Sequence, residues 1–203
     1  MDQIVCLGDV ASLGPQPREV IARLHQLEIP IIMGNHDNYL LNPSLTENHH
    51  PWLRAAELWC VTQLTTNDLN YLGTFKPQII FHPDPKTTLL CFHGSPRSNE
   101  EFLYPTTPAE TLNEVFDGQS AQVLIGGHTH VQMVRQHKGM LFLNPGSVGQ
   151  PRDEDPRDSY AIVDLDAMTF TLRRAQYDFT VTQKLMKQAK LPERLIRRLR
   201  FGQ

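Results

Sequence analysis

The sequence VLIGGHTH at residues 123–130 decides how the rest of the chain is interpreted. Three apolar residues are followed by two glycines and then by His128 and His130, which predicts a buried strand that delivers imidazoles to a loop at its carboxyl end. Histidine is the commonest metal ligand, and glycine lets the backbone approach an ion closely. Because two histidines can also be ordinary polar loop residues, other segments must supply further ligands.

Three other apolar runs also end in polar residues of the kinds that bind metals. Each polar group alone has an ordinary explanation as a turn, a helix cap or a satisfied polar residue. Together they provide nitrogen and oxygen ligands without thiolate, which suits Mn, Fe, Zn, Co or Ni and a two-metal hydrolytic centre. The runs and the polar residues that follow them are Ile4–Leu7 before Asp9, Ile29–Met33 before Asn35, His36 and Asp37, and Thr87–Phe92 before His93.

The segment between the first two runs predicts a helix. Apolar side chains recur at helical spacing within Pro17–Leu27, and proline stands in the first turn. A strand, a helix and a second strand in this order imply a right-handed parallel unit, whose functional edge is the carboxyl end of its strands. All four polar groups are therefore expected at one edge of a sheet.

The remaining pattern predicts a mixed α/β protein. Helical segments are expected at Asn38–Leu72, with Thr66 as the N-cap of a short helix, at Thr107–Phe116, where Thr107 to Glu110 suggests a capping box, and at Val181–Arg200 with a break at Leu191. Further strands are expected at Ile79–Phe81 and in two hairpins, Gln132–His137 with Met140–Leu143 and Ser159–Leu165 with Thr169–Arg174.

The composition describes an ordinary soluble globular protein. With 203 residues, 40% of them hydrophobic and 20% charged, the chain is long enough for one core, and we expect a single domain at residues 1–203. A net charge of -3 argues against general nucleic-acid or membrane-surface binding. Without a membrane-spanning run or a recognisable secretion signal, a cytoplasmic protein is expected. The scattered Cys6, Cys60 and Cys91 predict buried free thiols.

In this order, the motifs Gly8-Asp9, Gly34–Asp37, His93-Gly94 and Gly126–His130 resemble those of the calcineurin-like metallophosphoesterase superfamily. The stretches at residues 144–149 and 191–195 resemble its compact branch of YfcE-type phosphodiesterases and diadenosine-tetraphosphatase relatives. The resemblance implies a four-layer α/β/β/α sandwich. It also implies metal-dependent hydrolysis, as a phosphodiesterase or phosphatase on a small organic phosphate, by a metal-bridged hydroxide.

The resemblance also implies a dinuclear divalent metal site, with Mn favoured. Asp9 would bridge the two ions, and Asn35, His93 and His128 would complete the ligands of one of them. His130 would bind the other ion.

Two catalytic residues are implied as well. His36 would protonate the leaving oxygen or stabilise charge on the phosphoryl group, and Asp37 would orient His36 by hydrogen bonding. The family's first motif, an Asp-x-His after a preceding strand, has no counterpart before Asp9, so we expect one metal site to be incomplete and one strand and helix to be missing. A misplaced start, a fragment or genuine degeneration would each explain this. The last alternative makes the chain a non-catalytic interaction scaffold on the same fold.

Several charged residues have open interpretations. Arg97 or Arg152 could hold a phosphate oxygen, but we favour an ordinary surface charge for both. The cluster Arg194, Arg197, Arg198 and Arg200 could attract an acidic partner, although a solvated helix face is the favoured interpretation. His49 and His50 are expected to be solvated loop residues. The expected partner is a small phosphorylated substrate, and homo-oligomer formation is left open.

Overall fold

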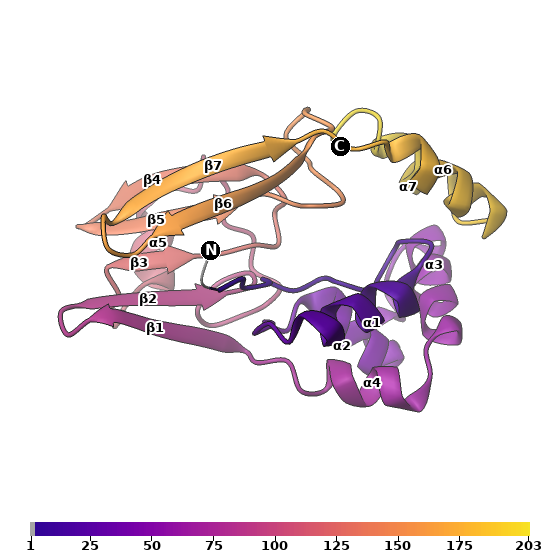
Figure 1. Cartoon of the computed structure of the whole chain (residues 1–203), viewed down its shortest axis with the longest axis horizontal. Helices are drawn as coiled ribbons and strands as arrows, with labels where there is room; N and C mark the ends of the chain where they lie inside the picture. Colours follow the sequence, from indigo (N-terminus) through magenta and orange to yellow (C-terminus); the bar gives the residue numbers. More distant parts are fainter. Residues whose placement is uncertain (1–2) are drawn as a thin grey trace.

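The structure is a computed structural model that describes residues 3–203. It is a mixed α/β fold with a five-stranded sheet in the order β1-β2-β3-β5-β4, a separate two-stranded hairpin, and helices that lie mostly at one end of the molecule (Figure 1). The five strands are β1 (Gln78–Asp84), β2 (Thr87–Phe92), β3 (Val123–Ile125), β4 (Gln132–His137) and β5 (Met140–Pro145). The predicted α/β class is confirmed.

Strand β3 lies at the centre of the sheet. It pairs in parallel with β2 on one side and β5 on the other, while β1 and β4 extend the sheet by antiparallel pairing. All three of its residues are buried, as expected for a short apolar strand between parallel neighbours that are covered on both faces. The central position of β3 is what brings the GGHTH loop to the middle of one sheet edge.

Both faces of the sheet are covered by apolar side chains. On one face, Leu124 and Phe142 pack with Leu112 of helix α5 (Ala109–Val115). On the other, Val163 and Phe170 of the hairpin formed by β6 (Asp158–Asp164) and β7 (Thr169–Ala175) pack against the sheet. The five-stranded sheet therefore has a helix on one face and the two-stranded sheet on the other, which agrees with the mixed α/β fold that the resemblance implied.

The two amino-terminal runs are extended but form much less sheet than predicted. In residues 3–203, one isolated parallel bridge, between Cys6 and Ile31, connects the two runs, and another pairs Ile32 of the second run with Lys76. The Ile32 N–H donates to the Cys6 carbonyl at 2.9 Å, so the direction and pairing of the runs are as expected. Pro30 lacks an N–H donor and Pro77 follows Lys76, which limits the ladder to these few bonds.

All helices except α5 gather at one end of the molecule (Figure 1). Five short helical segments follow the first extended run: α1 (Pro17–Leu27), α2 (Asn35–Leu41), the 3-10 helix η1 (Pro43–Thr46), α3 (Pro51–Gln63) and α4 (Thr66–Leu72). The last two helices of the chain, α6 (Phe179–Gln188) and α7 (Glu193–Arg198), pack back on α3 through a shared apolar cluster. Helix α3 therefore connects the amino-terminal half to the end of the chain.

Most local predictions are confirmed, and two caps are corrected. The helix at Pro17–Leu27, both hairpins and the break between α6 and α7 are present. Thr65, rather than Thr66, caps α4, because its Oγ1 accepts the Asp68 N–H. The predicted capping box at Thr107 is wrong, since its Oγ1 accepts the N–H of Tyr104 in the preceding turn.

The three cysteines are free thiols, with Cys60 and Cys91 buried as predicted and Cys6 half-buried. Burial raises the pKa of the Cys91 thiol to about 12, which makes this sulfur an unreactive core group. No helix within residues 3–203 has the length and apolar character needed to cross a membrane.

Candidate metal centre

Four elements end at one edge of the sheet and bring their polar residues together. The first extended run supplies Asp9, helix α2 supplies Asn35 at its first turn, and the ends of β2 and β3 supply His93 and His128. One potential ligand atom each from Asp9, His93 and His128 lie within 4.8 Å of one another, the one such group found among residues 3–203. The predicted convergence of three separate segments is confirmed.

The fourth predicted ligand of the same ion is part of this cluster. The His93 Nε2 atom lies 3.1 Å from Asn35 Oδ1 and 3.3 Å from Asp9 Oδ2. The ring of His128 lies with its centroid 5.0 Å from that of His93. A carboxylate, an amide oxygen and two imidazoles therefore face one another at a buried point.

Backbone carbonyls fix the orientation of two imidazole rings. The Nδ1 atom of His93 is 2.5 Å from the Leu7 carbonyl oxygen, and Nδ1 of His130 is 2.7 Å from the Gln150 carbonyl oxygen. Because a carbonyl can only accept, Nδ1 must carry a proton in both rings, so in the neutral form of each ring the lone pair is on Nε2. Histidines that bind metals are typically held in this way by their other ring nitrogen.

The residues present fit a divalent cation. Both ring nitrogens of His128 are buried and have no hydrogen-bond partner in the described part of the chain. Buried polar atoms are nearly always paired, so an imidazole with two orphaned nitrogens needs an explanation. A cation held by one nitrogen, with Asp9 and His93 as neighbours, accounts for it, and the nitrogen and oxygen donors suit a first-row transition metal.

His130 stands apart from this cluster. It follows His128 by two residues, but its ring is not among the three groups that converge. Its backbone carbonyl accepts the Arg152 N–H at 3.0 Å, and its side chain is held by the Gln150 carbonyl of the same loop. The expected division of the two histidines between different ligand sets is consistent with this arrangement.

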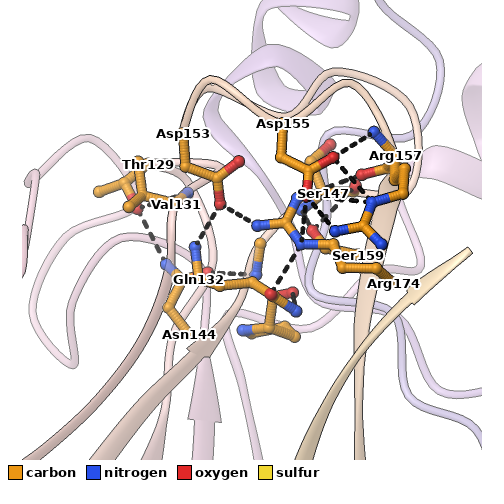
Figure 2. A network of polar contacts seen from close by, with 12 residues as sticks. Thr129, Val131, Gln132, Asn144, Ser147, Asp153, Asp155, Arg157, Ser159 and Arg174 are labelled. Carbon is orange, nitrogen blue, oxygen red and sulfur yellow. Dashed lines mark hydrogen bonds and ion pairs between the residues drawn. The ribbon is translucent and has the colours of Figure 1, made fainter. Parts of the chain in front are cut away.

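The backbone around the cluster is unusual. Asp9, His128 and His130 all have positive φ angles, of 60°, 64° and 60°. This left-handed region costs a residue with a Cβ atom on the order of 1 kcal/mol. The loop is held in this shape by Asn144, whose Nδ2 donates to the Gly127 carbonyl and to Thr129 Oγ1 (Figure 2).

Two glycines let the Asp9 and Asn35 loops approach each other. A Cβ atom on Gly8 would lie 2.5 Å from the Gly34 nitrogen, and a Cβ on Gly34 would lie 2.1 Å from Asp9 Oδ1. Both distances are far inside van der Waals contact. The glycines that the sequence places before Asp9 and Asn35 are therefore needed for the close approach of these two loops.

Asp9 and His93 form an electrostatic pair. Burial acts to raise the pKa of Asp9, but the charge of His93, with smaller effects from His36 and His130, holds this pKa well below its usual range. Burial acts to lower the pKa of His93, and the charge of Asp9 outweighs it and raises this pKa. The Asp9 carboxylate is therefore anionic at neutral pH, as a cation ligand must be.

The other two imidazoles are held neutral. Burial, followed by the charge of His93, lowers the pKa of His128 to about 4. Burial, followed by the charge of Arg152, lowers the pKa of His130 to about 3. A neutral imidazole keeps the lone pair that binds a metal ion, so both histidines are in the required state across the physiological range.

Asp37 holds the loops around the cluster. The predicted hydrogen bond between Asp37 and the His36 side chain is not found in residues 3–203. Its carboxylate accepts the backbone N–H groups of Asp9, Val10 and Gly34 at 2.7, 2.9 and 3.0 Å. Burial and then the charge of Asp9 raise the pKa of Asp37 to about 6. The Asp37 carboxylate is instead held by these three amides.

The carboxylate beside His36 is instead Glu57 of helix α3. Its Oε1 atom lies 3.3 Å from His36 Nδ1, and its side chain is almost fully buried. The sequence contained a signal for it. Leu53, Ala56 and Cys60 mark the apolar stripe of α3, and Glu57 occupies the same stripe at helical spacing.

His49 is also corrected, because it is not a solvated loop residue. Its Nδ1 atom lies 2.9 Å from Glu57 Oε2, and its ring packs edge-on against Tyr39. The same Tyr39 ring also packs edge-on against His36. Glu57 thus lies between two imidazoles, while His50 is exposed as predicted.

The two candidate arginines have different environments. Arg97 pairs with Glu101 at 2.6 Å on the surface, so the surface-charge interpretation is confirmed for it. The same interpretation is wrong for Arg152, which is mostly withdrawn from solvent and whose charge acts on His128 and His130. Arg198 is likewise turned inward and not on a solvated helix face.

An α/β fold with an Asp, Asn and His cluster where the parallel strands β2 and β3 end is the arrangement of a protein with a loop-borne metal centre. Comparison with known families identifies the chain more closely. Residues 1–168 match the calcineurin-like phosphoesterase superfamily domain, and the chain belongs to this family. Metal-dependent phosphoester hydrolysis is the chemistry of the family.

Individual relatives agree with this assignment. An uncharacterized protein of Methanocaldococcus jannaschii is 28% identical over 98% of this chain and 86% of its own length. The probable metallophosphoesterase YsnB of Bacillus subtilis is 26% identical over 76% of this chain and 80% of its own length. Among solved structures, a metallophosphoesterase from Sphaerobacter thermophilus has a TM-score of 0.84 and 33% identity, covering 100% of this chain and 89% of its own.

Proposed function

We propose that this protein hydrolyses phosphodiesters or phosphomonoesters of small organic compounds in a reaction that depends on a divalent metal ion. The observation that carries the proposal is the convergence of Asp9, His93 and His128, with potential ligand atoms within 4.8 Å of one another. The two unpartnered, buried nitrogens of His128 support it further. The cytoplasmic location expected from the sequence is part of the proposal.

Asp9, Asn35, His93 and His128 would hold one cation, for which Mn²⁺ is our first choice. When bound, such a cation supplies Lewis acidity toward phosphoryl oxygens and lowers the pKa of coordinated water. The chain contributes a preset geometry, because the Leu7 carbonyl fixes the His93 ring before any ligand arrives. His130 would serve a second cation, whose remaining ligands are not apparent in residues 3–203.

His36 is the proposed proton donor to the leaving oxygen. It follows Asn35 directly, its backbone N–H donates to Asp9 Oδ1 at 3.0 Å, and its side chain is mostly buried. The Glu57 carboxylate lies 3.3 Å from Nδ1, within ion-pair distance, and would help to hold the ring in place. Asp37 would act indirectly, by holding the backbone of Asp9 and Gly34.

The test is hydrolysis by the purified full chain of bis(4-nitrophenyl) phosphate and 4-nitrophenyl phosphate, with added Mn²⁺ and with EDTA. We expect Mn²⁺-dependent release of nitrophenolate that His128→Ala lowers by more than the roughly 10–100-fold that loss of a ligand's hydrogen-bond partner costs. His25→Ala is the matched control, because His25 is an exposed residue of α1. Activity that survives EDTA, or that His128→Ala leaves intact, would refute the proposal.

A non-catalytic scaffold on the same fold is the second candidate. The position of His130 outside the three-residue cluster favours it, because it leaves one ligand set of the described residues incomplete. A scaffold of this kind would bind a metal ion through Asp9 and His93 but would hydrolyse neither ester. Metal binding measured together with turnover therefore separates the two functions.

A further inference from the structure

Arg152 and Arg198 share an unusual environment. Both are largely withdrawn from solvent, and neither lies within 4.0 Å of a carboxylate of residues 3–203. The Nε atom of Arg198 is inaccessible and has no hydrogen-bond partner in that part of the chain. A buried cation without a counter-charge is unfavourable, so these side chains need a partner of opposite charge.

Two acidic residues near Arg152 pair with other arginines. On the same loop as Arg152, Asp153 pairs with Arg174, and Asp155 pairs with Arg157 at 2.6 Å (Figure 2). Arg152 lies next to Asp153 in the sequence, yet it forms no ion pair with it.

The two unpaired arginines are close neighbours. Burial, followed by the repulsive charges of Arg152 and Arg194, lowers the pKa of Arg198 to about 9. The Nη2 atom of Arg198 donates to Gln150 Oε1, and the carbonyl of the same Gln150 holds the ring of His130. Two like charges held together away from water would be stabilised by an anion between them.

Both arginines are attached to the loop that holds His130. The backbone N–H of Arg152 donates to the His130 carbonyl at 3.0 Å. Gln150, which accepts a hydrogen bond from Arg198, lies two residues before Arg152 and holds the His130 ring through its own carbonyl at 2.7 Å. An anion held by the two arginines would therefore lie beside the metal centre.

We propose that Arg152 and Arg198 bind a phosphate group of the substrate other than the one that is hydrolysed, so that the preferred substrate carries at least two phosphate groups. Guanidinium groups match phosphate oxygens in pairs, and a dianion balances two buried cations. The statement that this phosphate belongs to the substrate rests on the proposed phosphoesterase function. The statement that Arg152 and Arg198 bind an anion is independent of that function.

The first arm of the test measures binding of inorganic phosphate to the full chain by calorimetry in the presence of EDTA. We expect binding that weakens at least tenfold in Arg198→Gln and in Arg152→Gln. Arg157→Gln is the matched control, because this arginine lies on the same loop but is exposed and paired with Asp155. Absence of binding, or equal binding by all variants, overturns the anion site. If Arg198→Gln does not fold, Arg198→Lys replaces it and is expected to weaken binding in the same direction.

The second arm measures phosphate release with Mn²⁺ from fructose 1,6-bisphosphate and from fructose 6-phosphate. Arg198→Gln should raise KM for the bisphosphate at least tenfold with little change in kcat, and should leave KM for the monophosphate unchanged. Equal effects on both sugars, or on neither, would overturn the assignment of the substrate. If neither sugar is hydrolysed but bis(4-nitrophenyl) phosphate is, the substrate assignment fails while the proposed function stands. If no ester is hydrolysed, the proposed function fails, and phosphate binding alone decides the anion site.

Discussion

Glu57 Oε1 lies 3.3 Å from His36 Nδ1 in the interior between α2 and α3. If this carboxylate positions His36 as a proton donor, Glu57→Gln should lower kcat most for esters with poor leaving groups, which need protonation most. We expect roughly a tenfold loss for diphenyl phosphate and a much smaller one for bis(4-nitrophenyl) phosphate, within the range of general acid catalysis. Steady-state kinetics with both esters measure the difference.

The control for this prediction is Glu47→Gln, which changes an exposed carboxylate at the end of η1. Glu57→Asp should recover part of the lost rate, because it keeps the charge. An equal loss for both esters would mean that Glu57 only supports the structure. A loss that appears solely in KM would also contradict a positioning role.

The ligand cluster predicts about one tightly bound metal ion per chain. Asp9, Asn35, His93 and His128 face one another, whereas His130 is held apart by Gln150. After loading with Mn²⁺ and desalting, metal analysis should give a ratio nearer one than two. His128→Ala should lower it strongly and His130→Ala should not. Two ions in the unaltered chain, or loss of the first ion in His130→Ala, would show that the division of ligands is wrong.

Gly34→Ala should destabilise the fold. The added Cβ would lie 2.1 Å from Asp9 Oδ1 and 2.4 Å from the Asp9 backbone nitrogen, so one of the two loops must move. We expect a loss of roughly 1–3 kcal/mol, as for other overpacked sites. Urea denaturation measures it. Gly149→Ala is the control, because a Cβ there meets nothing within 4 Å, and an equal loss in both variants would contradict the explanation.

Asp158 predicts a dependence of stability on pH. Burial raises its pKa to about 7 at the start of β6, where its Oδ1 has no hydrogen-bond partner in the described chain. Because the unfolded chain ionises this group near pH 4, its contribution to stability falls as pH rises from about 4 to 7 and stays low above that. Asp158→Asn should therefore raise the melting temperature at pH 8.

Asp158→Asn should raise the melting temperature less at pH 5, because Asp158 still makes most of its contribution to stability at that pH. Asp158 is only partly buried, so solvent screening limits the effect to a few degrees. Asp117→Asn, at an exposed turn, is the control. Thermal melts at both pH values decide the matter, and an equal stabilisation at pH 5 and pH 8 would contradict the assignment.

The residues at the strand ends could be predicted because a local pattern and a general rule suffice for them. An apolar run followed by glycine and a polar residue marks the end of a strand, and parallel strands end at the same edge of a sheet. The pattern and this rule were enough to predict that Asp9, His93 and His128 lie close together. The extent of the first two strands could not be predicted in this way, since Pro30 and Pro77 interrupt the ladder without changing the apolar pattern.

The residues that were missed lie on helices that approach the site from elsewhere in the chain. Glu57 is on the buried stripe of α3, but only the packing of α2 against α3 shows that this stripe faces His36. Arg198 is one of several arginines at helical spacing, and only the docking of α7 turns this one inward. A side chain's environment on a helix depends on contacts distant in sequence, which the local pattern does not contain.

The positive φ angles of Asp9, His128 and His130 lower the stability of the fold at the residues that form or flank the proposed metal centre. Glycine accepts this backbone conformation without the penalty that a Cβ atom brings. Glycine would nevertheless remove the Asp9 carboxylate that accepts the His36 N–H and the His130 ring that the Gln150 carbonyl holds. The fold therefore keeps side chains with a backbone cost at the three positions where the proposed metal ligands are needed.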